Sequence, residues 1–125
     1  MADQHHLHLL RKGVQPWNIW KRTYSGKPDL SGADLSGLNI SYIDFRDTDL
    51  SGANLSNCDL TGASLRGANL QGADLRYTLR RACAGADLTG AILSGVDLYK
   101  ADLRRTGLQG ADYEEAPFTA TPAGV

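Results

Sequence analysis

Three histidines near the start of the chain are the first residues to test for chemistry, because imidazole nitrogens are common metal ligands. His5 and His8 are three residues apart and would meet on one turn of a helix. Structural zinc usually takes four ligands, and Asp3 is the one further ligand close in sequence. We therefore predict no metal site, and we expect His5, His6 and His8 to face solvent.

Carboxylates recur along the chain at a fixed spacing, and carboxylates are frequent general acids and bases. No pair of them stands beside a histidine or a nucleophile, and they recur because a longer pattern recurs. The glycines are also regularly spaced, and none precedes the Lys-Ser/Thr signature of a phosphate-binding loop. We predict no catalytic residue, no cofactor and no small-molecule substrate, so we do not expect an enzyme.

Arginines form a small cluster at residues 76, 80 and 81, and guanidinium groups recognise carboxylates and phosphates well. This cluster of Arg76, Arg80 and Arg81 is a candidate contact for an acidic partner. The alternative interpretation is a tolerated insertion with solvated arginines. Two further arginines, Arg46 and Arg66, are twenty residues apart and would share one face of a coil of that length.

A five-residue repeat organises the chain from Pro28 to Phe118. Segments such as Ser31-Gly32-Ala33-Asp34-Leu35 recur, with a small residue two positions before a large apolar one. On an α-helix five residues turn through about 500°, so such leucines would form no stripe. The predicted core consists of the large apolar residues of the repeat: Leu30, Leu35, Ile40, Phe45, Leu50, Leu55, Leu60, Leu65, Leu70, Leu75, Leu88, Leu93, Leu98, Leu103, Leu108, Tyr113 and Phe118.

Each repeat predicts a short extended segment followed by a corner. The small and large residues are two positions apart and point to the same side of an extended chain, so the residue between them points outward. The next inward residue comes three positions later, which requires a turn. Glycine two residues after the leucine supplies the positive φ of a type II turn. Where Tyr42, Asp47 or Tyr77 takes that position, we expect another turn type.

Units too small to bury their own leucine must stack on each other, which predicts an all-β solenoid. The Ala-Asp/Asn-Leu-X-X pattern over about 90 of the 125 residues resembles the pentapeptide-repeat protein family. The resemblance implies a right-handed quadrilateral β-helix with four repeats to a coil, hence about four to five coils. The stretch from Trp17 to Lys21 is similar to the segment preceding the repeats in small cyanobacterial members.

Residues 1–27 do not repeat, and we predict that they form a short α-helical cap. Asp3 is placed to begin a helix that ends near Gly13, and Pro16 suits the first turn of a second helix. Trp17 and Trp20 share one face of that helix and would cover the first coil, where the inward residues are largest: Leu38, Ile40, Ile43 and Phe45. The alternative for the tryptophans is a platform that stacks a ligand.

The later part of the chain holds two irregular features. Leu75 and Leu88 are thirteen positions apart, so we predict an insertion of three residues in an irregular segment at 78–85 of the 28–118 β-helix. At the far end Tyr113 and Phe118 replace leucine, and residues 119–125 are expected to form a flexible tail. An apolar end of this kind is a candidate homodimer contact, with plugging of a monomer as the alternative.

Charge and cysteine content suggest a compartment and limit the class of partner. The net charge is −1, divided into +4 for residues 1–27 and −5 for the remainder. Cys58 lies in a small inward position, which suits a reduced core thiol. Neither a membrane-spanning run nor a secretion signal is recognised, so we expect a cytoplasmic protein without membrane contact.

Two functions follow from these features. The first is a protein-protein interaction or scaffold module with an unknown protein partner. The second is implied by the family resemblance: some members imitate duplex DNA and bind DNA gyrase or another type II topoisomerase. The weak negative charge and the interspersed arginines disfavour the second function, and direct nucleic-acid binding is not expected.

Overall fold

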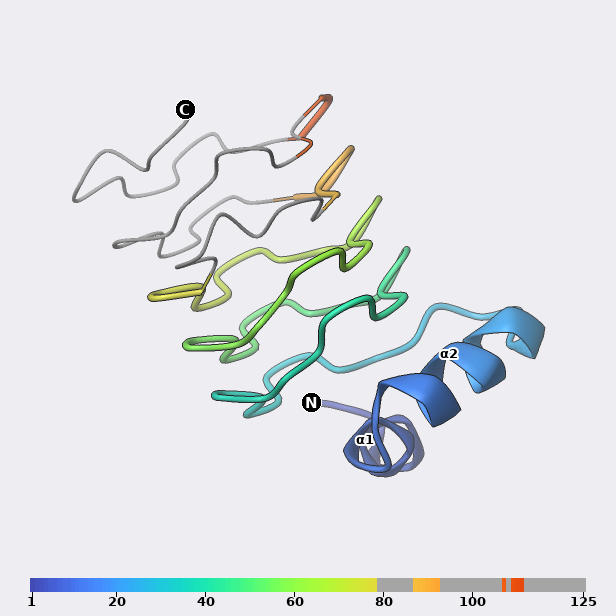
Figure 1. Ribbon diagram of the computed structural model, residues 1–125. Helices are drawn as coiled ribbons and strands as arrows, with labels where there is room; N and C mark the ends of the chain where they lie inside the picture. Colours follow the sequence, from blue (N-terminus) through green and yellow to red (C-terminus); the bar gives the residue numbers. More distant parts are fainter. Residues whose placement is uncertain (79–86, 93–106, 108, 112–125) are drawn as a thin grey trace.

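Parallel bridges between residues twenty apart define the coil. The computed structural model describes residues 1–78, 87–92, 107 and 109–111. Within them, four successive bridges join Asp29 to Asp49, Asp34 to Asn54, Asn39 to Asp59 and Asp44 to Ser64. Each coil therefore has four sides of five residues, which we number 1 to 4 in chain order from the side of Asp29. Successive coils lie one above the other (Figure 1).

The register changes once in the described part of the chain. Ser64 pairs with Asp87 and Asn69 with Ile92, and both pairs are 23 residues apart. Asp87 then pairs with Gly107 at the regular spacing of twenty. The third coil thus contains three extra residues, as the leucine spacing predicts. The segment 79–86 lies outside the described residues.

All described corners use one backbone conformation. The carbonyl of each large inward residue accepts a hydrogen bond from the N–H three residues later, as Leu50 does from Ala53 at 3.0 Å. Glycine at the corner has positive φ, for example 65° at Gly52. Tyr42, Asp47 and Tyr77 have φ between 57° and 62°, so the expectation of another turn type at these positions was wrong. Asn57 adopts the same conformation at 60°.

The stack imposes this conformation, because the corner N–H groups belong to the ladder between coils. The Gly37 N–H donates to Ser56, and the Tyr42 N–H donates to Thr61 in the same way at 2.8 Å. A different turn at Tyr42 would break this bond, so the Tyr42 backbone adopts the left-handed conformation although the residue is not glycine.

The core is the line of large inward residues along the coil. Those within the described residues are 0–2% exposed: Leu30, Leu35, Ile40, Phe45, Leu50, Leu55, Leu60, Leu65, Leu70, Leu75 and Leu88. Burial of each leucine is worth about 1.5–3 kcal/mol. The remaining predicted core positions lie outside the described residues: Leu93, Leu98, Leu103, Leu108, Tyr113 and Phe118.

Leu38 is an exception among the predicted inward residues of the first coil. Its side chain is 36% exposed, whereas Ile40, Ile43 and Phe45 are buried. The residue one coil later at the same position, Cys58, is also buried. Leu38 is exposed because it lies at the N-terminal edge of the stack, with no earlier coil above it.

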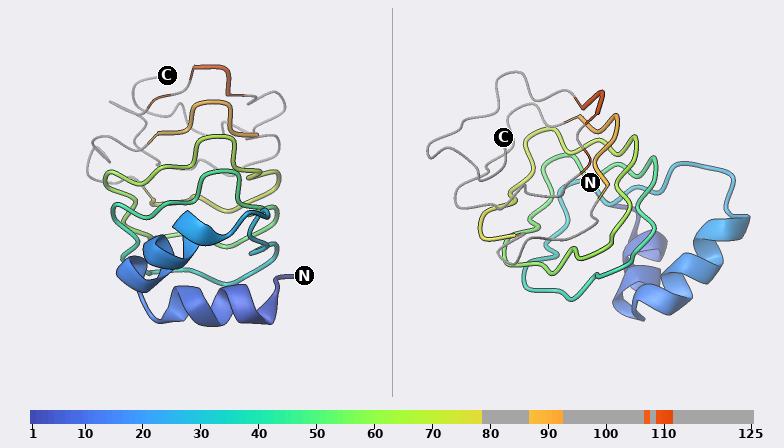
Figure 2. Two further views of the ribbon diagram at one scale, coloured as in Figure 1. Left: turned by 90° about the vertical axis from the view of Figure 1, so that its right-hand side faces the viewer. Right: turned by 45° about the horizontal axis from the view of Figure 1, so that its top comes forward.

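Two helices lie at the N-terminal end of the stack (Figures 1 and 2). Helix α1 spans Gln4–Arg11, and the Asp3 carboxylate accepts hydrogen bonds from the N–H groups of His5 and His6 at its start. Helix α2 spans Val14–Thr23, with Gly13 before it at a φ of 118°. Both follow the helix signals of the sequence, including Pro16 in the first turn of α2.

Candidate interaction surfaces

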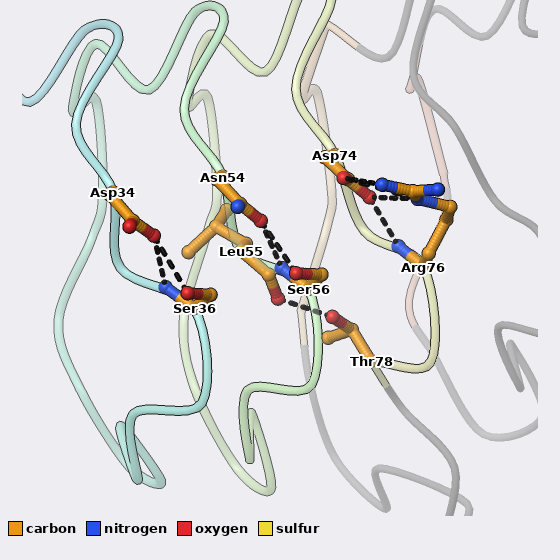
Figure 3. A network of polar contacts seen from close by, with 8 residues as sticks. All are labelled: Asp34, Ser36, Asn54, Leu55, Ser56, Asp74, Arg76 and Thr78. Carbon is orange, nitrogen blue, oxygen red and sulfur yellow. Dashed lines mark hydrogen bonds and ion pairs between the residues drawn. The ribbon is translucent and has the colours of Figure 1, made fainter.

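Outward Asp and Asn side chains between the inward positions hold the corners of the coil. On side 2, Asp34 Oδ1 accepts from the Ser36 N–H at 3.1 Å and from its hydroxyl at 2.7 Å. Asn54 accepts from Ser56 in the same way one coil later. Figure 3 shows these pairs and Asp74 with Arg76 on three stacked coils. The recurring oxygens are therefore local acceptors that fix the turn.

These hydrogen bonds also settle the ionisation of the carboxylates. The Ser36 hydroxyl, followed by the Ser36 N–H, lowers the pKa of Asp34 from its ordinary value. The Thr89 hydroxyl lowers the pKa of Asp87, and the Arg46 guanidinium lowers that of Asp44. Such groups stay ionised at neutral pH and do not serve as general acids. Among the described residues, no group of three His, Cys, Asp or Glu side chains could hold a metal ion.

Three arginines pair with aspartates on the outer surface. Arg46 makes a bidentate contact with Asp44, with distances of 2.9 and 2.8 Å. Arg76 holds Asp74 with distances that include 3.0 and 2.7 Å. Arg66 is 3.8 Å from Asp87. The arginine side chains are 49–61% exposed, so each pair contributes about 0–1 kcal/mol, and the pairs neutralise part of the surface charge.

A shallow hollow of about 360 Å³ lies at the corner after side 4, lined by Arg46, Asp47, Arg66, Gly67 and Thr89. The prediction that Arg46 and Arg66 share a face is confirmed. Thr89 joins them because the 23-residue register places it beside Arg66, a position that the three-residue insertion in the leucine spacing already implies. Two guanidinium groups at its rim suit a carboxylate or phosphate, although each already has an aspartate partner.

The predicted arginine cluster is described only at Arg76. Its guanidinium is bound to Asp74, as Figure 3 shows. Arg80 and Arg81 lie outside the described residues, as do the predicted dimer residues Tyr113 and Phe118. Both surfaces therefore stay predictions.

Trp17 lies against side 4 of the first coil. It is fully buried, its indole N–H donates to the Asp44 carbonyl at 2.8 Å, and its ring packs edge-on against Phe45. Trp20 is half-buried and stacks on Tyr24 with ring centres 4.5 Å apart. Trp17 has no free ring face to offer a ligand, and its contacts are those of packing.

His6 is buried, so the expectation that all three histidines face solvent was wrong for this residue. Its Nδ1 accepts a hydrogen bond from the Asp29 N–H at 3.0 Å. Its ring lies about 5 Å from the rings of Trp20 and Tyr24. The reason is the open edge of the first coil, where the Asp29 N–H needs an acceptor. His5 and His8 are exposed.

Among the described residues, three buried polar side chains, Thr48, Cys58 and Thr78, replace alanine in the inward small position, and the last two bond to the preceding coil. The Cys58 thiol donates to the Leu35 carbonyl, and the Thr78 hydroxyl donates to the Leu55 carbonyl one coil later. Burial raises the pKa of Cys58 to about 11, so the thiol is protonated and unreactive at neutral pH. Both residues act in packing.

The stacked four-sided coils define a β-solenoid repeat protein. The model of the pentapeptide-repeat family matches with eight copies, over residues 29–67, 43–77 and 83–114. These matches cover more than half of the sequence. The chain belongs to the pentapeptide-repeat family.

Solved structures agree with this assignment. A pentapeptide repeat protein from the Arabidopsis thaliana thylakoid lumen is 35% identical over 73% of this chain and 61% of its own, with a TM-score of 0.66. A pentapeptide repeat protein from Nostoc is 36% identical over 80% of this chain and 74% of its own, with a TM-score of 0.46. The chain thus spans less than two thirds of the Arabidopsis chain.

HetL, a Nostoc pentapeptide repeat protein involved in heterocyst differentiation regulation, is 35% identical over 70% of this chain and 37% of its own, with a TM-score of 0.38. No curated protein matches the sequence significantly. In the described part of the chain, neither helix is long and apolar enough to span a membrane.

Proposed function

We propose that this protein is a non-enzymatic scaffold that binds a protein partner through the outer surface of its β-helix. The observation that carries the proposal is the use of the recurring carboxylates as corner acceptors, which leaves them in structural roles. Arg46, Arg66 and Arg76 remain more than two fifths exposed and can add contacts to an acidic partner. A rigid surface of repeated short side chains suits recognition better than chemistry.

Cross-linking and affinity capture from the native cell, followed by binding of the purified partner, test this function. One variant carries Arg76→Gln, Arg80→Gln and Arg81→Gln, and a second carries Arg46→Gln and Arg66→Gln. A matched control replaces Arg11 and Arg22 of the two helices in the same way. We expect one of the first two variants to bind the partner at least tenfold more weakly than the wild type. Equal affinity of all three variants would exclude both arginine surfaces, and turnover of a substrate would refute the non-enzymatic proposal.

We also propose the detailed architecture of this chain that its family resemblance implies. We assign residues 1–27 to a cap and residues 28–118 to a right-handed quadrilateral β-helix of about four to five coils, with 78–85 irregular and 119–125 as a flexible tail. The contacts of Trp17 and His6 with the first coil support the cap. Limited proteolysis checks these bounds, since we expect cleavage first after residue 118 and within 78–85.

A homodimer through the C-terminal end is part of the proposal. Light scattering of the wild type and of a Tyr113→Ser, Phe118→Ser variant tests it. We expect a dimer that becomes a monomer in the variant. A monomeric wild type would show that these aromatics close the end of a single chain.

We propose that the protein is located in the cytoplasm, and cell fractionation tests this location. The Arabidopsis relative is a protein of the thylakoid lumen, a different compartment.

Imitation of DNA is the weaker alternative. It requires a strongly negative rod, whereas Asp44, Asp74 and Asp87 are paired with arginines on the described surface. We expect no inhibition of gyrase supercoiling at low micromolar protein. Inhibition there would replace the scaffold proposal with the alternative.

A further inference from the structure

The N-terminal edge of the first coil is closed on two of its four sides. On side 1, the Asp29 N–H donates to His6, and the Asp29 carbonyl accepts from the Asp3 N–H at 3.0 Å. On side 4, the Asp44 N–H donates to Asn18 at 2.8 Å, and the Asp44 carbonyl accepts from the Trp17 indole. The cap thus supplies on each side the donor and the acceptor that a preceding coil would supply.

Sides 2 and 3 of the same edge lack this closure. One coil later, the Asn54 N–H donates to Ala33 at 2.9 Å and the Asp59 N–H donates to Leu38 at 3.0 Å. The equivalent groups of the first coil belong to Asp34 and Asn39. Among the described residues, no group pairs with the backbone N–H or C=O of either residue. Two short strand edges are therefore unpaired.

Exposure follows the same division. Asp34, Ser36 and Leu38 are exposed, whereas the corresponding Asn54 and Ser56 of the next coil are half-buried and Cys58 is buried. Asn39 is exposed, as is its counterpart Asp59. Leu38 contributes an apolar side chain to this edge. The inward residues Leu35 and Ile40 are nonetheless 1–2% exposed, so the lumen behind the edge is closed. The free surface is a strand edge with one apolar side chain.

We propose that sides 2 and 3 of the first coil form a docking edge for an extended segment of a partner protein, with an apolar side chain against Leu38 and a basic side chain beside Asp34. This edge deepens the scaffold function and rests on it. Strand addition to an unpaired edge takes its affinity from main-chain hydrogen bonds and its specificity from alternate side chains.

The chain itself shows that an extended segment suits this edge. On side 1 the segment before α1 lies along the coil: Asp3 is extended, with φ −67° and ψ 123°, and its N–H bonds to Asp29. The amino group of Met1 reaches the Ser31 hydroxyl at 3.1 Å. A partner segment would continue this arrangement around the next two sides.

Space and charge favour a single basic segment over a second copy of the chain. Both helices project beyond the first coil at this end (Figures 1 and 2), so a whole second coil would meet them. Hydrogen bonds from Ser36 keep Asp34 ionised, and no ion pair involves it within the described residues. It is the one charged side chain between residues 30 and 43, which suits a lysine or arginine of the partner.

The test uses amide NMR of the full chain with the blocked peptide acetyl-Lys-Thr-Val-Thr-Leu-Thr-amide. In the free protein we expect fast hydrogen exchange at the Asp34 and Asn39 amides and slow exchange at Asp29 and Asp44. The peptide should shift the Asp34 and Asn39 signals saturably, with a Kd on the order of 1 mM. A peptide with N-methylated alternate residues should bind at least tenfold more weakly, and one with Glu in place of Lys about threefold more weakly.

Two variants make the test specific. Leu38→Ser should weaken the peptide about threefold to tenfold, while Ile19→Ser, which changes an exposed apolar residue of α2, should leave its affinity unchanged. The proposal is overturned by absence of shifts at 10 mM peptide, by equal binding of the N-methylated peptide, or by shifts confined to Asp29 and Asp44. Shifts that depend on protein concentration without peptide would assign the edge to a second copy instead. None of these results bears on the arginine variants, so failure of this edge and failure of the scaffold function remain distinguishable.

Discussion

The replacement of Trp17 by phenylalanine tests how helix α2 holds the first coil. Phenylalanine keeps an aromatic ring against Phe45 but removes the indole N–H that donates to Asp44 at 2.8 Å. The lost hydrogen bond and the carbonyl left without its donor together cost about 1–3 kcal/mol. The smaller ring also leaves unfilled volume at a fully buried site, which adds to the loss. We expect the free energy of unfolding to fall by about 2–4 kcal/mol.

Trp20→Phe provides the matched control. Trp20 is half-buried, and within the described residues its indole N–H has no hydrogen-bond partner. The same chemical change there should cost less than about 1 kcal/mol. Urea unfolding followed by far-UV circular dichroism measures both variants without relying on tryptophan fluorescence. Equal losses for the two variants would refute the role of the Trp17 hydrogen bond.

Three further predictions follow from the coil. Gly52→Ala should destabilise the protein by about 1–2 kcal/mol, because alanine is strained at a φ of 65°. No atom lies within 4 Å of the new methyl group, so this backbone strain is the whole cost. Gly52→Asn should cost less in the same urea titration, since Asn57 already adopts this conformation. The Arg46 guanidinium lowers the pKa of Asp44 below its ordinary value of 3.8. The ionised carboxylate therefore stabilises the fold above pH 3.8, and this stabilisation is lost as the pH falls below that value. Asp44→Asn should make the melting temperature fall less steeply with decreasing pH in the acid range. Cys58, with its pKa raised to about 11, should resist a thiol reagent at pH 8 in the native state and react in urea, and rapid native labelling would contradict its burial.

The five-residue period allowed the line of core residues to be predicted within the described part of the chain. A side of the coil has room for one small and one large inward residue, and a corner must follow every fifth position, so the spacing alone assigns the inward slots. The three-residue insertion was equally readable, because the spacing of thirteen between Leu75 and Leu88 exceeds two repeats by three residues. Asp3 and Gly13 marked the first helix through ordinary capping chemistry.

Other features depend on contacts between coils, which no local pattern encodes. Tyr42 adopts the left-handed corner because its N–H must reach Thr61, a residue nineteen positions later. His6 is buried because the Asp29 N–H, 23 residues away, needs an acceptor.

Within the described residues, the sequence by itself determined the line of large apolar side chains in the lumen, because a stacked coil buries an apolar residue at every fifth position. The tertiary structure decided which sides of the first coil are paired at its N-terminal edge. A repeat specifies the hydrogen bonds between identical units, but no unit precedes the first described coil. The two N-terminal helices pair with Asp29 and Asp44 and leave the backbone of Asp34 and Asn39 unpaired among the described residues. That division depends on where two helices settle in space, which is a property of the assembled molecule.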